Sequence, residues 1–456
     1  MNRAAVLLLS LLLVLTGCQS DGNNDNGPAT ITVWIGDTLP DRVTVMRGLA
    51  DQFTAQTGTT VDLVSVDEDQ FPEALTRTAA DGQLPDVIGS QPLSALYTLA
   101  TAQLLDIDAA DDVVRSLGPA TFERRALELT SDGVHQLAVP SDSWVQLIYY
   151  RKDWFQQANL APPRTFTDVR KAAATLHQIG WRTGIVAPNV AGDNFTQQVF
   201  EEFALGNGCQ VQSLTGRVVF DDQSCVATLS FYAEMLNRYS VPGVQDVDSV
   251  RTDYLAGKAA MVVWSSYLLD ELAGLRDDVM PDCLQCQDDP LFLAHNTGVV
   301  AGMLGPYGVD PMQFGEISSW AIPVDSEREP AKAYVQFMMS EGYVQGLSFA
   351  PEGKLPLRKG PVAGSTAYLE AWRDLPIGVN RKMLLRDIYP PDVVAAVEIG
   401  PQTFHQWSGD LIGASLAELP IPAAVHAVVT RAQSPQQAAE EAAFTLREIQ
   451  DTLPRY

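Results

Sequence analysis

The alternation of short apolar runs with segments of helical spacing constrains the fold of this chain more than any other feature. Residues 31–35 and 61–66 have the composition of strands, and apolar side chains recur between them at helical spacing until Gly58, a typical helix stop. A strand, a helix and a strand of this combined length imply parallel strands joined by a right-handed crossover. A buried strand at 85–89 and a helix at 92–105 continue the pattern. The N-terminal part of the chain therefore predicts an α/β domain.

A second series of strands and helices follows and ends in a well-marked C-terminal helix. The predicted strands are 145–151, 181–186 and 259–264, and the predicted helices are 153–159, 165–177 and 267–275. Near the C-terminus, Ser434, Pro435 and Gln437 form the pattern of a capping box with proline in the first turn. The 456 residues are enough for two large domains or about three of ordinary size.

The N-terminal residues predict export and a lipid anchor. Arg3 precedes an apolar run at 4–15, which is shorter than the ~20 residues that a membrane-spanning helix needs. A positive start and a short apolar core are typical of a secretory signal peptide. The tetrapeptide Leu-Thr-Gly-Cys that ends at Cys18 resembles the lipobox of bacterial lipoproteins. It implies a signal peptide at 1–17, a lipid on Cys18 and a flexible tether at 18–29. The alternative is an ordinary signal peptide in which Cys18 has no role.

Cysteine usage agrees with export. Besides Cys18 four cysteines remain, and an even number outside the cytoplasm favours disulfides. Four cysteines allow three pairings, of which we favour the local one, Cys209–Cys225 and Cys283–Cys286. The second pair could instead be a redox Cys-x-x-Cys motif. Three nearby aspartates speak against this, because negative neighbours raise the pKa of a thiol.

Charge and histidine content exclude several classes of partner. The formal net charge is −26, and an acidic surface repels the phosphate backbone of nucleic acids. The same charge disfavours electrostatic binding to anionic lipid, so we expect membrane contact through the lipid anchor only. The five histidines are scattered, and none pairs with another at the spacing of a zinc site. We therefore expect no metal and no cofactor.

A series of motifs resembles one family. Residues 149–155 (YYRKDWF) and 159–168 (NLAPPRTFTD) resemble the pattern YYNKDLF…GL..PPKTWDE of bacterial extracellular solute-binding proteins related to the maltose-binding protein. Five further segments resemble other parts of the family in the same order, namely 84–87, 102–106, 133–140, 255–261 and 329–337. The chain departs from the family at Arg151, where Asn is usual, at Ser318-Ser319, where Gly is common, and at Tyr267, where many members have Trp.

The resemblance implies an α/β fold of the two-lobe periplasmic-binding-protein type, with the ligand cleft between lobes that are joined by crossing hinge strands. It implies lobe 1 at 30–141 plus 298–350 and lobe 2 at 142–297 plus 351–456. Two physical arguments agree with a cleft site. Ligands of open parallel sheets bind beyond the carboxyl ends of strands, and clefts between domains are frequent small-molecule sites. We expect hinge closure around the ligand.

Polar and aromatic residues that follow predicted strands, or lie at the predicted crossings, are candidates for the site. Aspartates can accept hydrogen bonds from hydroxyls, and aromatic rings can stack on the C–H faces of sugar rings. Arg358 lies in a segment that often faces the cleft in the family. The candidates are Asp37, Ser90, Gln91, Asp142, Trp144, Trp264, Ser265, Tyr267, Ser318, Ser319, Trp320 and Arg358. The structural alternatives are a turn or helix cap for the polar residues and core packing for the tryptophans.

The sequence thus favours a lipid-anchored receptor on the extracytoplasmic face of the cell membrane. We expect it to act as a monomer that binds a mono- or oligosaccharide and delivers it to the permease subunits of an ABC importer. A glycerophosphodiester, a polyol or a uronic acid is the alternative ligand, but Arg358 alone is thin support for an anion. A distant alternative is an exported enzyme on the same fold. We expect no catalysis, because the even cysteine count leaves no free thiol nucleophile and no Gly-x-Ser-x-Gly motif occurs.

Overall fold

The computed structural model describes residues 29–67, 70–178 and 182–453. The predicted signal peptide and Cys18 lie outside these residues. The strands are β1 (Thr30–Ile35), β2 (Thr60–Ser65), β3 (Val87–Gln91), β4 (Val139–Arg151), β5 (Met261–Ser265), β6 (Thr297–Val300), β7 (Gln313–Ala321), β8 (Leu355–Pro356), β9 (Pro376–Ile377), β10 (Met383–Leu384) and β11 (Phe404–His405).

The helices complete the set of elements. They are α1 (Pro40–Thr57), α2 (Phe71–Ala80), α3 (Leu93–Thr101), α4 (Ile107–Leu117), η1 (Pro119–Thr121), α5 (Arg124–Leu129), α6 (Lys152–Gln157), α7 (Phe166–Leu176), α8 (Asn194–Gly206), α9 (Gln223–Tyr239), α10 (Val247–Leu255), α11 (Leu268–Leu272), η2 (Leu284–Gln287), α12 (Phe292–Asn296), α13 (Arg328–Met338), α14 (Tyr343–Leu347), α15 (Ala367–Arg373), α16 (Leu385–Ile388), α17 (Pro391–Thr403), α18 (Asp410–Ser415), α19 (Pro420–Val429) and α20 (Pro435–Thr452). Within the described ranges, no helix has the length and apolar content that crossing a bilayer requires.

The predicted β-α-β unit is confirmed in β1, α1 and β2. β1 pairs in parallel with β2 on one side and with β3 on the other. Leu49 and Phe53 of α1 are buried in the core that also contains β1. The helix ends where Gly58 adopts a φ of 81°, a left-handed conformation that costs a glycine little.

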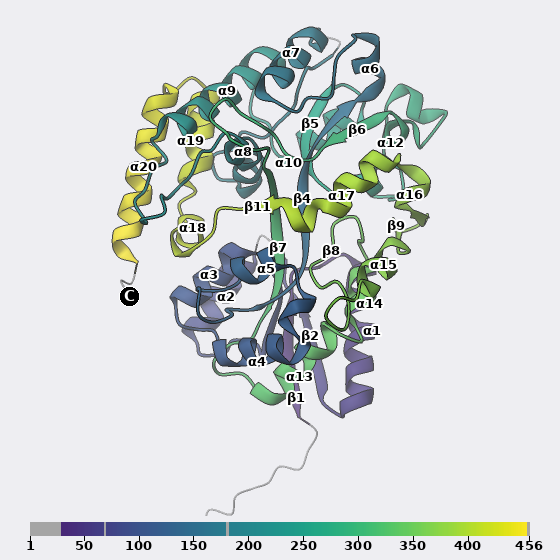
Figure 1. The fold of residues 1–456 in the computed structure, drawn as a ribbon, viewed down its shortest axis with the longest axis vertical. Helices are drawn as coiled ribbons and strands as arrows, with labels where there is room; N and C mark the ends of the chain where they lie inside the picture. The colour runs from purple at the N-terminus through teal and green to yellow at the C-terminus, as the bar shows by residue number, and fades with distance from the viewer. Residues whose placement is uncertain (1–28, 68–69, 179–181, 454–456) are drawn as a thin grey trace, which may run out of the picture.

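A nine-stranded sheet connects the two halves of the molecule. Its central path is β2-β1-β3-β7-β4-β5. The N-terminal half of β4 pairs with β7 and β8, whereas its C-terminal half pairs with β5 and β6. Figure 1 shows one lobe around β1 and β2 and a second around β5 and β6, with β4 and β7 running between them. This is the predicted two-lobe α/β architecture with crossing strands.

The pairing of β6 bears on one predicted lobe boundary. The family resemblance implies a return to the first lobe at residue 298, but β6 pairs with residues 148–151 in the C-terminal half of β4. Val300 and Met303 also pack in the core of the second lobe. We therefore propose that residues 298–312 belong to the second lobe and that β7 carries the chain back.

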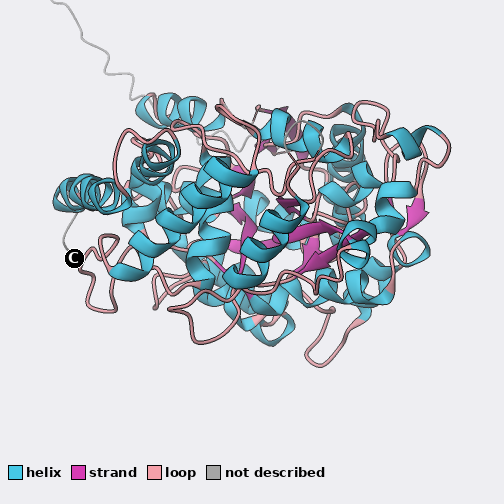
Figure 2. Ribbon diagram, turned by 90° about the horizontal axis from the view of Figure 1, so that it is seen from above, coloured by secondary structure: helices cyan, strands magenta, loops and turns pink. Residues whose placement is uncertain are grey.

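Two clusters of buried apolar side chains stabilise the fold. The first core includes Ile31, Val33 and Val87 from β1 and β3. The second core is built mainly on helices and includes Phe203 of α8 and Leu446 of α20. Figure 2 shows helices packed around the central strands when the molecule is viewed from above.

Three further predicted elements have different outcomes in the structure. The C-terminal capping box is confirmed, since the Ser434 side chain accepts from the N–H of Gln437 and the Gln437 side chain accepts from the N–H of Ser434. The predicted strand at 181–186 is wrong, because the described part of this segment, residues 182–186, forms only isolated bridges. The backbone N–H of Gly184 donates to the Tyr239 carbonyl at 2.8 Å instead of joining a strand ladder. The helix predicted at 267–275 is present but shorter, because α11 covers only Leu268–Leu272.

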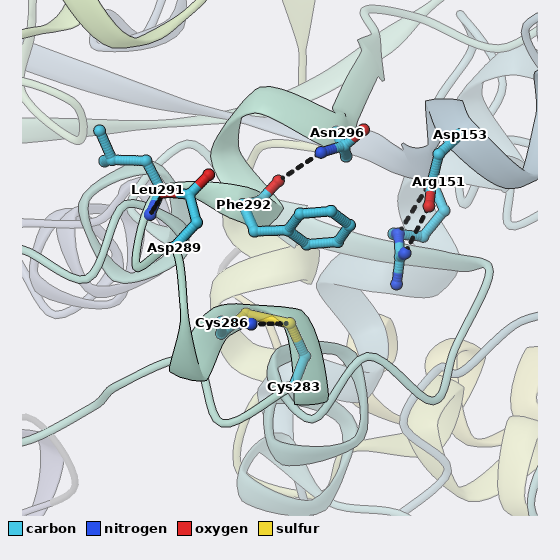
Figure 3. The surroundings of a disulfide bond; sticks show 8 residues. All are labelled: Arg151, Asp153, Cys283, Cys286, Asp289, Leu291, Phe292 and Asn296. Atoms are coloured by element: carbon cyan, nitrogen blue, oxygen red, sulfur yellow. Dashed lines mark hydrogen bonds and ion pairs between the residues drawn. A yellow bond between two sulfur atoms is a disulfide. The ribbon is translucent and has the colours of Figure 1, made fainter.

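Both predicted disulfides are confirmed. Cys209 pairs with Cys225 across 16 residues and so links the segment after α8 to the first turn of α9. Cys283 pairs with Cys286 across three residues, and all four cysteines are buried. Figure 3 shows the second disulfide beside α12.

The side chain of Arg151, which replaces the usual Asn of the family, is buried and held by an ion pair and two aromatic rings. Its guanidinium donates to both carboxylate oxygens of Asp153, at 2.9 and 2.6 Å. The guanidinium carbon also lies 4.3 Å from the ring centroid of Trp154 and 5.4 Å from that of Phe292, the ring beside it in Figure 3. Only 1% of Arg151 is exposed, so this buried charge is paired as such charges must be.

Candidate functional site

A cavity of about 480 Å³ lies where β4 and β7 run between the lobes. Its walls come from segments far apart in the chain, including the loop after β1, the start of α3, α11 and the segment before β8. It is lined by Gly36, Asp37, Leu39, Arg42, Phe71, Leu75, Ser90, Gln91, Pro92, Ala95, Trp144, Arg251, Tyr267, Asp270, Glu271, Arg276, Asp278, Val279, Glu316, Ile317, Ser318 and Lys354. We call this cavity the cleft.

Six of the twelve predicted ligand residues line the cleft, namely Asp37, Ser90, Gln91, Trp144, Tyr267 and Ser318. They come from the loop after β1, the end of β3, the crossing strands β4 and β7, and the turn before α11. Ser90 has a φ of 58°, which is uncommon for a residue with a side chain. Strained backbone of this kind concentrates at functional sites, and here it occurs near the carboxyl end of β3, whereas the sequence placed Ser90 just after the strand.

Three aromatic residues, Phe71, Trp144 and Tyr267, form part of the cleft wall. Trp144 of β4 is half-buried, and its ring centroid lies 5.6 Å from that of Phe314 in β7. Tyr267 precedes α11, and the Arg42 guanidinium carbon lies 5.3 Å from its ring centroid. Burial raises the pKa of the Tyr267 hydroxyl well above its usual value, so this phenol stays neutral. Neutral aromatic faces of this kind suit stacking against apolar faces of a ligand.

Two predicted residues of β5, Trp264 and Ser265, do not line the cleft. Trp264 is buried with its ring centroid 4.7 Å from that of Phe195, and the Arg251 guanidinium lies over it at 6.0 Å. It therefore supports a cleft residue instead of facing the cavity. The backbone carbonyl of Ser265 accepts a hydrogen bond from the Tyr149 hydroxyl at 2.9 Å.

The remaining four predicted residues are also outside the cleft lining. Ser319 is buried and donates to the Gln91 carbonyl at 3.1 Å. Trp320 packs so closely over Gly89 that a Cβ there would lie 2.3 Å from its ring.

Asp142 and Arg358 are buried in polar contacts within the protein. Asp142 accepts from the Ser141 hydroxyl at 2.7 Å and from Lys354 Nζ at 3.1 Å, so it reaches the cleft only through Lys354. Arg358 is 2% exposed and donates to the Thr121 hydroxyl and to the main-chain carbonyls of Leu117, Met339 and Pro361. Arg358 therefore joins distant chain segments, because the N–H groups of its guanidinium donate to other groups of the protein.

Four cationic side chains line the cleft that the sequence did not predict, and each is paired with a carboxylate. Arg42 lies 3.3 Å from Asp37, and Lys354 lies 3.1 Å from Asp142. Arg251 lies 2.7 Å from Asp248 and 3.4 Å from Glu271. Arg276 lies 2.8 Å from Asp278 and 3.8 Å from Asp270. The positive charges of the cleft are therefore neutralised before any ligand enters.

Two acidic side chains of α11 are held in an environment that favours their neutral form. Burial raises the pKa of Asp270 to about 6 although Arg276 opposes the shift. Burial also raises the pKa of Glu271 to about 7 although Arg251 opposes it. Desolvation penalises the charged form of a carboxyl, which is the cause of both shifts. Within the described residues, no group of three or more His, Cys, Asp and Glu side chains is arranged to hold a metal ion.

Comparison with known families identifies the chain. Residues 36–345 match the family described as Bacterial extracellular solute-binding protein. The chain belongs to this family. The match covers most of the described fold, including both crossing strands and the residues of the cleft up to β7. Members of the family are solute-binding proteins and are not enzymes, which agrees with the expectation of binding without catalysis.

One curated relative and two solved structures extend the comparison. The solute-binding protein is 25% identical over 430 residues to the putative ABC transporter periplasmic-binding protein YcjN of Escherichia coli (strain K12), covering 91% of this chain and 92% of that one. It resembles maltose-bound MalE3 of T. maritima with a TM-score of 0.70 at 20% identity, covering 92% of this chain and 100% of that one. It resembles UgpB from Mycobacterium tuberculosis in complex with glycerophosphocholine with a TM-score of 0.70 at 17% identity, covering 93% and 99%. These structures confirm the two-lobe periplasmic-binding fold.

Among the cleft residues that the sequence analysis did not predict, only the two acids of α11 had a recognisable sequence signal. Asp270 and Glu271 stand inside the otherwise apolar segment Leu268–Leu272, where two adjacent acids are unusual for a buried helix. Arg42 and Arg276 had none, since a single arginine near a helix end is read as a solvated surface residue. Their positions in this solute-binding protein follow from tertiary contacts only.

Proposed function

We propose that this solute-binding protein captures a mono- or oligosaccharide in the cleft and delivers it to an ABC importer. The observation that supports the proposal is the composition of the cleft, in which Trp144 and Tyr267 stand among hydroxyl, carboxylate and amide groups whose charges are balanced. A saccharide combines apolar C–H faces with a rim of hydroxyls, so it matches aromatic walls with a polar surround. MalE3 of T. maritima is described as bound to maltose, and the E. coli relative as a putative ABC transporter protein.

The ligand that remains bound through purification tests this proposal directly. The full-length protein is purified under native conditions, and the released ligand is identified by mass spectrometry after denaturation. We expect a neutral saccharide. Recovery of a glycerophosphodiester, such as the glycerophosphocholine of the UgpB complex, would contradict the saccharide proposal. The role as a solute-binding protein would still stand.

We further propose that Cys18 carries a lipid that holds the receptor at the extracytoplasmic face of the cell membrane. The lipobox-like tetrapeptide behind a short apolar run supports this. The change Cys18→Ala should abolish lipid labelling with radioactive palmitate and leave the protein unprocessed or released. A soluble form that starts near Asp21 should bind the same ligand with unchanged affinity, because the residues that line the cleft in the described part of the chain all lie at or after Gly36. Equal lipid labelling of the wild type and Cys18→Ala would contradict the anchor.

A further inference from the structure

We propose that a second cavity, at the junction of the two lobes, binds a small oxyanion between Arg125 of α5 and His405 of β11. The cavity has a volume of about 290 Å³ and shares no lining residue with the cleft. In Figure 1, α5 lies just below β11 and α18, and residues of all three elements line the cavity. We call it the junction cavity. The inference goes beyond the proposed saccharide function, because this site is separate from the cleft.

The polar lining of the junction cavity consists of basic and neutral side chains. They are Arg125, Gln210, Gln212, His405, Gln406 and Ser408, and the other lining residues are apolar. Among the described residues that line the cavity there is no aspartate or glutamate. This lining stands out in a chain with a formal net charge of −26, whose cleft is lined by several carboxylates. An anion therefore meets no carboxylate in the described wall, and apolar neighbours strengthen its attraction to a cation.

Arg125 and His405 reach the junction cavity from segments that pack in different cores. Arg125 belongs to α5, whose Ala126 and Leu129 lie in the first core. His405 ends β11 and is soon followed by Trp407, which lies in the second core. Burial lowers the pKa of the His405 imidazole, and the positive charge of Arg125 lowers it further. An anion between these two groups would therefore contact both sides of the junction.

Arg125 retains donors for such an anion. Its Nη1 lies 3.7 Å from Glu128, which is too long for a good hydrogen bond. Glu128 also lies 2.9 Å from Arg124, so two arginines share one carboxylate. By contrast, each cation of the cleft lies within 3.3 Å of a carboxylate. A guanidinium has five N–H donors in a planar fork that matches the oxygens of a phosphate or a carboxylate.

His405 supplies the second donor. The residue is half-buried, and none of the hydrogen bonds among the described residues involves its ring. An imidazole that carries a proton on both nitrogens can donate to an oxyanion, and the anion in turn favours this form. The amides of Gln212 and Gln406 are engaged elsewhere, because they donate to the Gly216 carbonyl and to Glu316. Recognition of the anion therefore rests on Arg125 and His405.

Gln406 connects the junction cavity to the cleft. Its Nε2 donates to Oε1 of Glu316 at 3.3 Å, and Glu316 lines the cleft. An anion in the junction cavity would therefore lie beside a solute in the cleft without taking its place. Since such an anion contacts both sides of the junction, it would favour the arrangement in which the two sides are close together.

The experiment measures the binding of two probes, inorganic phosphate and succinate, to the full-length protein. Calorimetric titration at pH 6 and constant ionic strength gives the affinity for each probe. Arg125→Gln and His405→Gln each replace one of the two groups by a neutral amide. Arg124→Gln is the matched control, because it removes the same charge from the neighbouring residue, whose side chain is 90% exposed and outside the cavity lining. Melting curves verify that each variant is folded.

We expect at least one of the two probes to bind to the wild type, and the tighter one identifies the kind of oxyanion. Arg125→Gln and His405→Gln should each bind it about tenfold more weakly, a loss typical of one hydrogen bond to a charged group. Arg124→Gln should behave as the wild type. The proton resonances of the His405 ring, identified by their loss in His405→Gln, should shift when the probe is added to the wild type.

Three results would overturn the inference. The first is that neither probe binds to the folded wild type. The second is an equal loss of affinity in all three variants, which would show only an effect of net charge. The third is a loss in Arg125→Gln but not in His405→Gln, which would show that the anion does not lie between the two groups. None of these results affects the saccharide proposal, which the co-purified ligand tests.

Discussion

Trp144 and Trp264 have opposite surroundings, although both were predicted to stack on a ligand. Trp144 is half-buried in the cleft wall, whereas Trp264 is buried behind Arg251. Strand periodicity could not separate them, because four of the five residues of β5 are buried and its two faces look alike in sequence. In β7 the period of two does distinguish Ser318, which lines the cleft, from Ser319, which points away from it.

Replacement of each tryptophan should therefore produce a different defect. Trp144→Ala should weaken ligand binding by about tenfold to a hundredfold, since central aromatic contacts are commonly worth about 2 kcal/mol or more. Its melting temperature without ligand should change little. Trp264→Ala should instead cost about 3–5 kcal/mol of stability, the usual loss for a large core residue. Calorimetric titration with the co-purified ligand and melting curves of both variants check this. A collapsed melting temperature with unchanged affinity in Trp144→Ala would place that indole in the core.

Glu202 is a buried carboxyl whose titration should be visible in stability. It is fully buried in α8, and its Oε2 accepts from the Phe314 N–H at 2.6 Å, which ties the helix to β7. Burial raises the pKa of Glu202 to about 8. Because the folded value lies above the unfolded value of about 4.3, this group's contribution to stability is fully present at low pH and is lost as pH rises towards 8.

Glu202→Gln should flatten the pH dependence of unfolding. Between about pH 5 and pH 8 the wild type takes up protons on folding, and removal of one such group lowers the slope by up to about 1.4 kcal/mol per pH unit. Urea unfolding at several pH values measures the slope. Glu201, Asp270 and Glu271 also have raised pKa values and should leave part of the slope in place. An identical slope in the wild type and Glu202→Gln would show that Glu202 is ionised in the folded state.

At the scale of elements, the sequence predicted the features that depend on neighbouring residues, but it did not predict those that depend on tertiary contacts. The β1-α1-β2 unit, the capping box of α20 and both disulfides could be predicted, because each depends on residues close in sequence or on parity. The segment at 182–186 could not, since the backbone N–H groups of Gly184 and Ile185 donate to the carbonyl of Tyr239 at the end of α9, which leaves isolated bridges at Thr183 and Val186. Arg358 was misplaced for the same reason, because its partners lie in α4, η1 and the segment after α13.

The two disulfides should differ in their effect on stability. In the chain-entropy description, closing the 16-residue separation between Cys209 and Cys225 contributes about 3 kcal/mol, and the short Cys283–Cys286 loop contributes about 2 kcal/mol. The double variant Cys209→Ala/Cys225→Ala should therefore melt at a lower temperature than Cys283→Ala/Cys286→Ala. Calorimetric melting of both against the wild type gives the order. The reverse order would mean that the short loop holds native structure that its length does not indicate.

At the scale of the whole molecule, α18 joins the two cores beside the cleft. Leu411 and Ile412 of α18 belong to the second core, whereas Leu93 and Tyr97 of α3 belong to the first. The two helices meet at Gly413, where a Cβ would lie 2.9 Å from the Ser94 carbonyl oxygen and 3.2 Å from the Thr98 nitrogen. Pro92 and Ala95 at the start of α3 line the cleft, so this contact lies beside it. We propose that the contact forms as the lobes close around the ligand.

A side chain at residue 413 should therefore oppose closure without touching the ligand. Gly413→Val places atoms against the α3 backbone, which cannot move aside as a flexible side chain could, so α18 and α3 must separate. We expect a larger radius of gyration in solution scattering and ligand affinity reduced several-fold, because part of the binding free energy is then spent on restoring the closed arrangement. Ala417→Val, on the exposed segment after α18, is the matched control and should change neither quantity. If Gly413→Val is folded and has the radius and affinity of the wild type, the contact between α18 and α3 plays no part in closure, and the crossing strands β4 and β7 alone set the relation of the lobes.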